Sequence, residues 1–201
     1  MTDWTGNKNS VYKTIGARNH TEGIRELNDY YATDPRAIDK LLTVAEPHVK
    51  IWEPACGGGH LSERLTELGH YVYSSDKVDR GYKRHTRTRD FLKAVSPPFL
   101  DNFDIITNPP YKYAKEFVLK SLELLPRGCR CYMFLKLTFL EGKARYEEIF
   151  KDTPPKFVYV FSERIQCAKN GDFKKYKNGA VAYAWFIWQK GWTGTTKLGW
   201  I

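Results

Sequence analysis

The segment Asn108-Pro109-Pro110-Tyr111 carries groups that could orient a planar amine. An aromatic amine is a poor nucleophile, because its lone pair is delocalised into the ring. Two acceptors around the nitrogen, the Asn108 side-chain oxygen and the Pro109 carbonyl, would favour a tetrahedral nitrogen and aim its lone pair at an electrophile. The prolines make the turn rigid, so the acceptors are held in place beforehand. Tyr111 could stack on the ring. The alternative is a proline turn that follows a buried strand and exposes a tyrosine.

A glycine loop, Glu-Pro-Ala-Cys-Gly-Gly-Gly-His-Leu, spans residues 53–61 between a strand-like and a helix-like segment. Glycines let the backbone turn sharply and approach a ligand closely. Glu53 ends the strand, where it could accept hydrogen bonds from an ammonium group. Asp76 ends the next strand, where it could bind both hydroxyls of a ribose. An acid at the loop entrance would repel a phosphate. These residues suit S-adenosylmethionine, although the glycines alone could form a plain strand-to-helix turn.

Strand-like and helix-like patterns alternate around these motifs, which predicts an α/β fold with a mainly parallel sheet and helices on both faces. Strands are expected at 50–53, 71–76, 103–107, 131–137, 157–161 and 181–188, and helices after Asp34 and at 60–68, 113–125 and 141–151. Ligands bind at the carboxyl ends of the strands in such sheets, and both motifs fall at these ends.

The chain has 201 residues, of which 42% are hydrophobic and 27% charged, a balance typical of one globular domain. Its formal net charge of +9 favours a polyanionic partner, and its aromatic share of 15% would suit stacking on unpaired bases. The four cysteines form no C-x-x-C pair, which predicts reduced thiols in a cytoplasmic protein and no metal site. Neither a signal peptide nor a membrane-spanning run is expected.

The glycine loop matches the pattern E-P-x-x-G-x-G-x-L and resembles that of the class I S-adenosylmethionine-dependent methyltransferases. The resemblance implies a Rossmann-like domain over residues 29–201, preceded by an irregular arm at 1–28. It implies a seven-stranded, mostly parallel sheet whose last strand, near 181–189, is antiparallel. The loop and its acid would hold the methionine part of the cofactor, Asp76 the ribose, and residues 90–91 the adenine.

Two further segments indicate which kind of methyltransferase the chain resembles. The sequence N-P-P-Y resembles the signature of the N6-adenine methyltransferases, and it also occurs in enzymes that methylate protein glutamine. The segment at 30–35 resembles the N-terminal cofactor motif of amino-methylating DNA enzymes, which helps to enclose the methionine end. Its alternative is a helix start capped by Asp34. The residues that we expect at the cofactor are Tyr31, Thr33, Pro35, Glu53, Pro54, Ala55, Gly57, Gly59, Asp76, Asp90, Phe91 and Asn108.

The chain over residues 19–201 is similar to a group of small methyltransferases found in phages and prophages. Larger DNA enzymes of this type carry a long target-recognition domain, for which no room is expected after Trp188. The target sequence would then be recognised by the loops at 80–90 and 165–179 or by a partner protein.

On the acceptor side, we expect Lys136 and Arg164 to contact phosphates and Phe173 to stack opposite Tyr111 on a flipped base. The sequence thus predicts methyl transfer from S-adenosylmethionine to the N6 amine of adenine in DNA. The alternatives are adenine in RNA, the amide of a protein glutamine, or a non-catalytic nucleic-acid-binding protein with a vestigial cofactor pocket. The positive charge and the basic runs at 80–89 and 169–177 favour nucleic acid.

Overall fold

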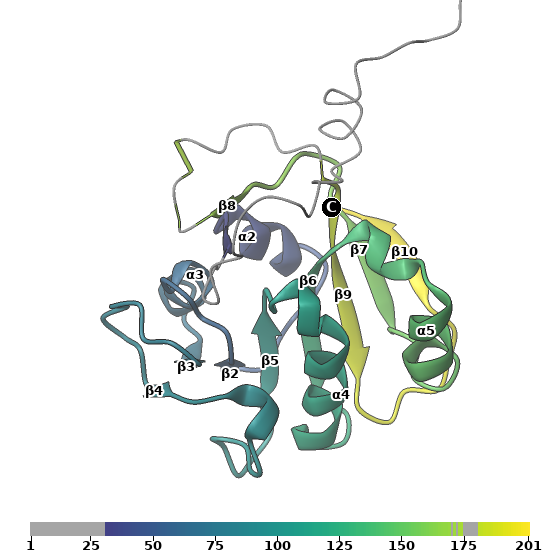
Figure 1. The fold of residues 1–201 in the computed structure, drawn as a ribbon, viewed down its shortest axis with the longest axis horizontal. Coiled ribbons are helices and arrows are strands. Elements are labelled where there is room, and N and C mark those ends of the chain that lie inside the picture. The colour runs from purple at the N-terminus through teal and green to yellow at the C-terminus, as the bar shows by residue number, and fades with distance from the viewer. Residues whose placement is uncertain (1–30, 170, 172, 175–180) are drawn as a thin grey trace, which may run out of the picture.

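The computed structural model describes residues 31–169, 171, 173–174 and 181–201, which Figure 1 draws as a coloured ribbon. The arm expected at 1–28 lies outside the described residues, and so do Lys175 and Lys177 of the second basic run. Within the described ranges, none of the helices is long and apolar enough to cross a membrane.

One sheet of eight strands forms the centre of the molecule, in the order β10-β7-β9-β6-β5-β2-β3-β4 (Figure 1). Strand β9 runs antiparallel to its neighbours β6 and β7, and the other pairs of this sheet are parallel. The strands are β2 (Lys50–Glu53), β3 (Tyr71–Asp76), β4 (Arg87–Thr88), β5 (Asp104–Thr107), β6 (Arg130–Lys136), β7 (Phe157–Val160), β9 (Tyr183–Gln189) and β10 (Lys197–Trp200).

The strand order reverses between β2 and β5. From β2 the chain continues outwards through β3 to β4, and it then returns to β5 on the other side of β2. In open α/β sheets such a reversal leaves a crevice at the carboxyl ends of the two central strands. The glycine loop follows β2 and the N-P-P-Y segment follows β5, so both motifs border this crevice.

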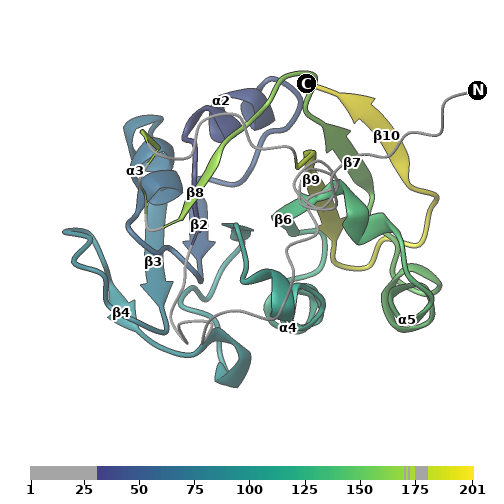
Figure 2. The same cartoon turned by 45° about the horizontal axis from the view of Figure 1, so that its top comes forward.

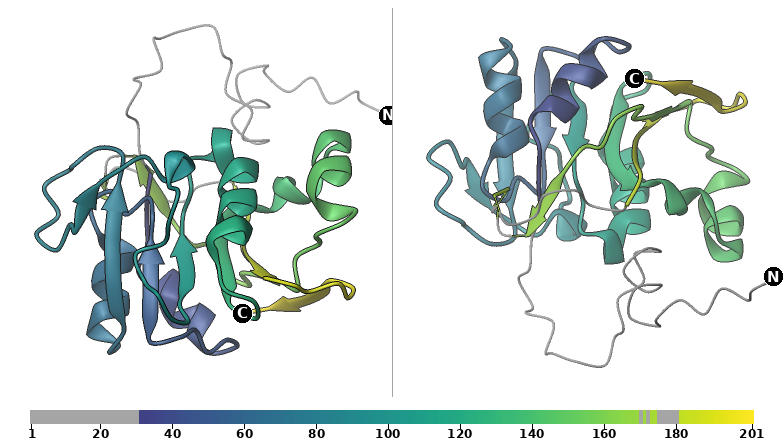
Figure 3. Two further views of the ribbon diagram at one scale, coloured as in Figure 1. Left: turned by 90° about the horizontal axis from the view of Figure 1, so that it is seen from below. Right: turned by 90° about the horizontal axis from the view of Figure 1, so that it is seen from above.

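Helices cover both faces of the sheet, with α2 and α3 on one side and α4 and α5 on the other (Figures 2 and 3). A π-helical turn, Tyr146–Phe150, continues α5, so the helix expected at 141–151 is present in two parts. The helices are α2 (Arg36–Leu42), α3 (His60–Glu67), α4 (Ala114–Leu124) and α5 (Lys143–Arg145), and the 3-10 turns are Phe91–Lys93, Tyr111–Tyr113 and Leu137–Leu140.

The apolar core consists of two clusters, one on each face of the sheet. Along β6, Cys131, Met133 and Leu135 belong to the cluster that contains residues of α4, whereas Tyr132 and Phe134 belong to the cluster that contains residues of α2 and α3. This assignment follows the two-residue period of a strand. Because helices cover both faces, the inner positions of the central strands, such as Ile105 and Ile106 of β5, are apolar towards both faces, which explains the continuous apolar runs within these strands.

The predicted fold class and the antiparallel direction of β9 are confirmed, but the strand count and the identity of the last strand are corrected. The sheet has eight strands, and the last is β10, which pairs in parallel with β7. The side chains of Leu198 and Trp200 are 54% and 67% exposed at this edge. A short edge strand with exposed side chains leaves no buried run in the sequence, so the pattern did not indicate it.

A second, two-stranded sheet joins β1 (Tyr31–Thr33) to β8 (Cys167–Lys169) in antiparallel register, with Thr33 opposite Cys167. Strand β1 contacts α3, the helix that follows the glycine loop. This small sheet therefore brings the segment expected to enclose the cofactor to the glycine-loop side of the crevice.

Candidate active site

Asn108 lies at the carboxyl end of β5. Two hydrogen bonds hold its side chain to a segment that is distant in the sequence. The Asn108 Nδ2 donates to the carbonyl oxygen of Tyr31 at 3.0 Å and to Thr33 Oγ1 at 2.8 Å. The Oδ1 of Asn108 is buried and has no hydrogen-bond partner among the described residues. A buried acceptor without a donor is costly. The site therefore presents a fixed acceptor that a donor from outside the chain could satisfy.

Tyr111 is enclosed by three side chains. Its ring centre lies 6.3 Å from that of Tyr183, with 29° between the ring planes. The Lys136 Nζ lies 5.0 Å from the centre of the Tyr111 ring, and the Tyr111 hydroxyl is 3.7 Å from Cys167 Sγ. Burial raises the pKa of Tyr111 well above its ordinary value. The hydroxyl is therefore protonated at neutral pH, so Tyr111 is a neutral aromatic residue rather than a phenolate base.

The glycine loop needs glycine at Gly59 for two reasons. Gly59 has a φ of 83°, in the left-handed region that side chains disfavour. The ring of Tyr82 also packs on this residue so closely that an added Cβ would lie 2.2 Å from a ring carbon. Nearby, Gly57 has a φ of 53°, and its backbone N–H donates to Asp76 Oδ2 at 2.9 Å. The loop is thus bound to the end of β3.

Glu53 is a buried acid at the end of β2, only 2% exposed. Ser62 Oγ donates to its carboxylate and lies 2.6 Å from Ser74 Oγ. Burial raises the pKa of Glu53 to about 8, and the neighbouring Asp76 carboxylate adds to the rise, which the Ser62 hydrogen bond opposes. In the described part of the chain, no cation pairs with Glu53. An ammonium group from a ligand would supply the positive charge with which the Glu53 carboxylate could pair.

Asp76 lies half-buried at the end of β3 and accepts two backbone hydrogen bonds. These come from the N–H groups of Gly57 and Val78, each at 2.9 Å. Each oxygen of a carboxylate has two lone pairs. Asp76 therefore still has acceptor capacity for hydroxyl groups such as those of a ribose.

The segment at Asp90 and Phe91 has a structural role of its own. The Asp90 carboxylate accepts from the backbone N–H of Leu92 at 3.1 Å, which caps a 3-10 turn, and pairs with Lys77 Nζ at 3.2 Å. The Phe91 side chain is 2% exposed and packs in the core. Only the backbone of Phe91 could therefore face a ligand.

The segment at 31–35 lies before α2. It forms the start of that helix, which is the alternative interpretation of its sequence, and it also contacts the site. Asp34 Oδ1 accepts from the backbone N–H of Arg36 at 3.0 Å, and Pro35 has a helical φ of −54°. Thr33 is 2% exposed and Tyr31 is 37% exposed. The two interpretations of this segment are thus compatible, because Asp34 caps the helix while the preceding strand contacts Asn108.

Of the three residues expected at the acceptor, the structure places only Lys136 beside Tyr111. Lys136 lies over the Tyr111 ring, within the site. Arg164 is exposed in the connection between β7 and β8. Phe173 packs edge-on against His60, with 5.5 Å between ring centres. Among the described residues no ring contact joins Phe173 to Tyr111, so Phe173 lies beside the glycine loop in this structure.

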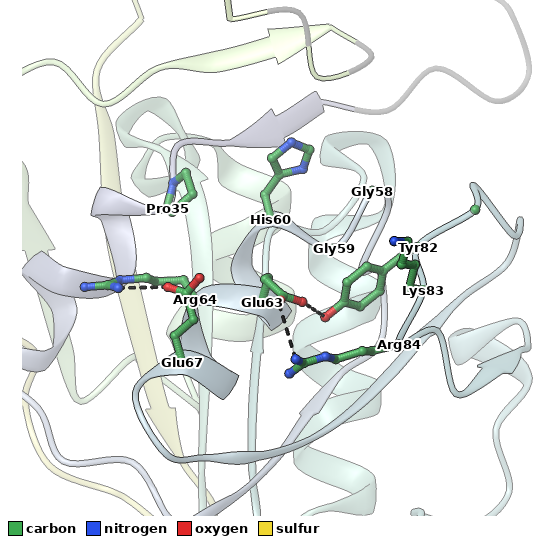
Figure 4. A pocket seen from close by; sticks show the side chains of 11 residues that line it. Pro35, Gly58, Gly59, His60, Glu63, Arg64, Glu67, Tyr82, Lys83 and Arg84 are labelled. Carbon is green, nitrogen blue, oxygen red and sulfur yellow. Dashed lines mark hydrogen bonds and ion pairs between the residues drawn. The ribbon is translucent and has the colours of Figure 1, made fainter.

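A hollow of about 550 Å³ lies beside the expected site, between the start of α3 and the loop at 81–84 (Figure 4). The Tyr82 hydroxyl donates to Glu63 at 2.9 Å, and Arg84 lies 3.6 Å from the same carboxylate. Neither Glu53 nor Asn108 lines this hollow. Its acids are neutralised by the chain itself, so it differs in chemistry from the crevice between β2 and β5.

A cluster of three potential metal ligands lies at the opposite, amino end of the strands. One ligand atom each from His48, Asp104 and Cys129 comes within 4.8 Å of the others. The buried Asp104 carboxylate accepts from the backbone N–H groups of His48, at 2.8 Å, and Arg130, at 2.6 Å. These bonds connect Asp104 of β5 to two other chain segments and account for the burial of its carboxylate.

Sequence reasoning missed several residues that contact the site. Ser62 is a polar residue on the otherwise apolar inner face of α3, and that position could have indicated a partner for a buried acid. Tyr82, Cys167 and Tyr183 lie far along the chain from the motifs they contact. No local pattern indicates such contacts.

Comparisons with known proteins agree with this architecture. No protein-family model matches the sequence, and no curated protein matches it either. A solved structure described as a modification subunit of a type I restriction enzyme from Vibrio vulnificus YJ016 is similar, with a TM-score of 0.62 and 14% identity over 86% of this chain. A protein from Streptococcus thermophilus described as a hemolysin has a TM-score of 0.58 and 11% identity, covering 89% of this chain and 71% of that one.

A Listeria monocytogenes protein described as a class I S-adenosylmethionine-dependent methyltransferase has a TM-score of 0.52 and 13% identity over 83% of this chain. The chain spans 47% of the Vibrio chain and 61% of the Listeria chain. The protein therefore has the fold of the class I S-adenosylmethionine-dependent methyltransferases. At these identities the likeness establishes the fold, and the activity has to be argued from the site.

Proposed function

We propose that this protein transfers a methyl group from S-adenosylmethionine to the N6 amine of adenine in DNA. The observation that carries this proposal is the Asn108 side chain at the carboxyl end of β5. Its Nδ2 is bound at 3.0 Å and 2.8 Å, while its buried Oδ1 lacks a donor among the described residues. Such an acceptor is suited to an N–H group of a planar amine.

The residues around the crevice fit S-adenosylmethionine. Glu53 is a buried acid that lacks a cation within the described ranges, and Asp76 retains acceptor capacity. In this proposal Glu53 binds the amino group and Asp76 the ribose, and Asp90 with the Phe91 backbone lies at the adenine. When bound, S-adenosylmethionine supplies an electrophilic methyl group on a sulfonium.

The chain's own contribution to the reaction is orientation. The Asn108 Oδ1 and the Pro109 carbonyl accept the two N–H groups of the adenine amine and turn its lone pair out of the ring plane. The buried Pro109 and the exposed Pro110 restrict this turn. Tyr111 stacks on the base, and its ring is supported by Tyr183 and Lys136. No strong general base is needed, since the amine becomes acidic only as it is methylated.

Two observations favour DNA as the acceptor. The net charge of +9 favours nucleic acid over protein glutamine. The likeness to a protein described as a restriction-enzyme modification subunit favours DNA over RNA. An adenine in a duplex would have to leave the base stack, at a cost of a few kcal/mol. In this proposal the basic loop at 80–90, or a partner protein, recognises the target sequence.

The test is transfer of tritiated methyl from S-adenosylmethionine to unmethylated DNA, with total RNA and a protein extract in parallel. Mass spectrometry of the digested products identifies the methylated group. We expect N6-methyladenine in DNA, and no label with the Asn108→Ala variant. Label in RNA or protein alone would overturn the substrate. Cofactor binding without transfer to any acceptor would favour the non-catalytic alternative.

A further inference from the structure

We infer that Thr33 is a positioning residue that holds the Asn108 side-chain amide in the orientation set by the Tyr31 carbonyl, in which the amide oxygen faces the acceptor amine. This inference rests on the proposed function, because it assigns Thr33 a part in the same reaction. The sequence resemblance places Thr33 at the cofactor instead. The structure gives it a direct contact to Asn108, with 2.8 Å between Thr33 Oγ1 and Asn108 Nδ2.

The orientation of the amide follows from the chemistry of its neighbours. An asparagine side chain ends in one acceptor oxygen and one NH2 group with two hydrogens. A backbone carbonyl can only accept, so the atom that lies 3.0 Å from the Tyr31 oxygen has to be the nitrogen. The oxygen then points the other way, to the buried position where it lacks a donor among the described residues.

Thr33 completes this arrangement because it accepts the second hydrogen of the NH2 group. Thr33 is 2% exposed, so water cannot readily replace its hydroxyl. Without it, the second hydrogen would be buried and unpaired, and the amide could rotate away from the geometry that serves the acceptor. The backbone of Thr33 is held in turn by the β1–β8 pairing, in which Thr33 lies opposite Cys167.

The same contacts link the two functional residues of the N-P-P-Y segment. Cys167 lies across from Thr33, and its Sγ is 3.7 Å from the Tyr111 hydroxyl. One short sheet thus contacts Asn108 through β1 and Tyr111 through β8. Since both ends of the segment are held from the same sheet, a change at Thr33 should affect the orientation of Asn108 more than the overall fold.

The test compares Thr33→Val, which keeps the shape and removes the hydroxyl, with Thr33→Ser, which keeps the hydroxyl. We expect Thr33→Val to lower kcat roughly tenfold, as loss of one buried hydrogen bond at an oriented group would, with KM for DNA and the Kd of S-adenosylmethionine changed less than twofold. Thr33→Ser should keep kcat within about twofold of wild type. Equal kcat in all three proteins, or equal loss in both variants, would overturn the inference.

A second measurement does not depend on activity. In protein labelled with 15N-asparagine, the side-chain NH2 signals of Asn108, assigned by their loss in Asn108→Ala, should show slow hydrogen exchange in wild type and in Thr33→Ser. Exchange should be at least about tenfold faster in Thr33→Val. Unchanged exchange would refute the positioning role. If wild type methylates no acceptor, the proposed function fails, and this measurement still decides the role of Thr33.

Discussion

The side-chain nitrogen of Asn108 donates to the backbone carbonyl of Tyr31, 77 residues earlier in the chain, at 3.0 Å. This bond joins the end of the central strand β5 to the small sheet formed by β1 and β8. It also determines the direction of the Asn108 oxygen. The segments that the sequence associates with the cofactor and with the acceptor are therefore in direct contact.

Replacing Asn108 by alanine should remove the oriented acceptor while leaving the cofactor residues Glu53 and Asp76 in place. We expect kcat to fall about a hundredfold to a thousandfold, since this is the usual effect of removing one polar group that acts on the reacting centre. The Kd of S-adenosylmethionine, measured by calorimetry, should remain within about threefold of wild type. Loss of cofactor binding together with activity would contradict the role given to Asn108.

Replacing Glu53 by glutamine should change how stability depends on pH. The pKa of Glu53 rises on folding from an ordinary 4.5 to about 8 because the side chain is buried. The folded protein therefore keeps a proton that the unfolded chain loses, and wild-type stability falls as pH rises from about 4.5 to about 8. Glu53→Gln removes this dependence, so its Tm should exceed that of wild type most clearly near pH 8.5.

The same substitution should weaken cofactor binding. If Glu53 binds an ammonium group, it has to ionise on binding, so the wild-type affinity for S-adenosylmethionine should increase as pH rises towards 8. Calorimetry should show proton release below that pH, and Glu53→Gln should bind weakly without this dependence. Glu67→Gln, at the exposed end of α3, the helix that follows the glycine loop, is the control and should behave as wild type. A wild-type affinity that does not vary with pH would exclude this role.

Replacing Gly59 by alanine should destabilise the protein through both conformation and contact. A left-handed φ costs a non-glycine residue roughly 1–2 kcal/mol, and the new Cβ would also collide with the Tyr82 ring, 2.2 Å away. Gly81 has a similar φ of 76°, but a Cβ there meets nothing within 4 Å. Gly81→Ala thus isolates the conformational cost. In urea unfolding, Gly59→Ala should lose more free energy than Gly81→Ala, and adding Tyr82→Ala should recover the difference. Equal losses of unfolding free energy at the two glycines would show that the collision with Tyr82 does not affect stability.

Two substitutions of Tyr111 should distinguish the contribution of its ring to activity from that of its hydroxyl. Tyr111→Ala removes the surface on which the base would stack, and base–aromatic stacking contributes about 1–3 kcal/mol. We expect kcat/KM for DNA to fall about 10- to 100-fold. Tyr111→Phe keeps the ring and loses the hydroxyl with its contacts, among them the one to Cys167 Sγ at 3.7 Å, and should keep kcat/KM within about threefold of wild type. A large loss in Tyr111→Phe would indicate that the hydroxyl takes part in the reaction.

The sequence by itself determined the fold class and the positions of the chemical groups. The apolar runs of the central strands, the helical segments between them, and the glycines of the loop are local patterns that their residues impose. Glu53 and Asp76 each end a strand and Asn108 follows one, and parallel strands present their carboxyl ends at one edge. The sequence alone therefore predicts that these three side chains lie at one crevice. The roles proposed for them remain predictions.

Only the tertiary structure decided how these groups are held. The bonds from Asn108 to Tyr31 and Thr33, the ring of Tyr82 on Gly59, and the packing of Phe173 against His60 join segments that have no shared periodicity. The strands β1, β8 and β10 are short and are defined by their pairing partners. Contacts between distant segments depend on how the chain folds back on itself, and residue types alone do not specify that geometry.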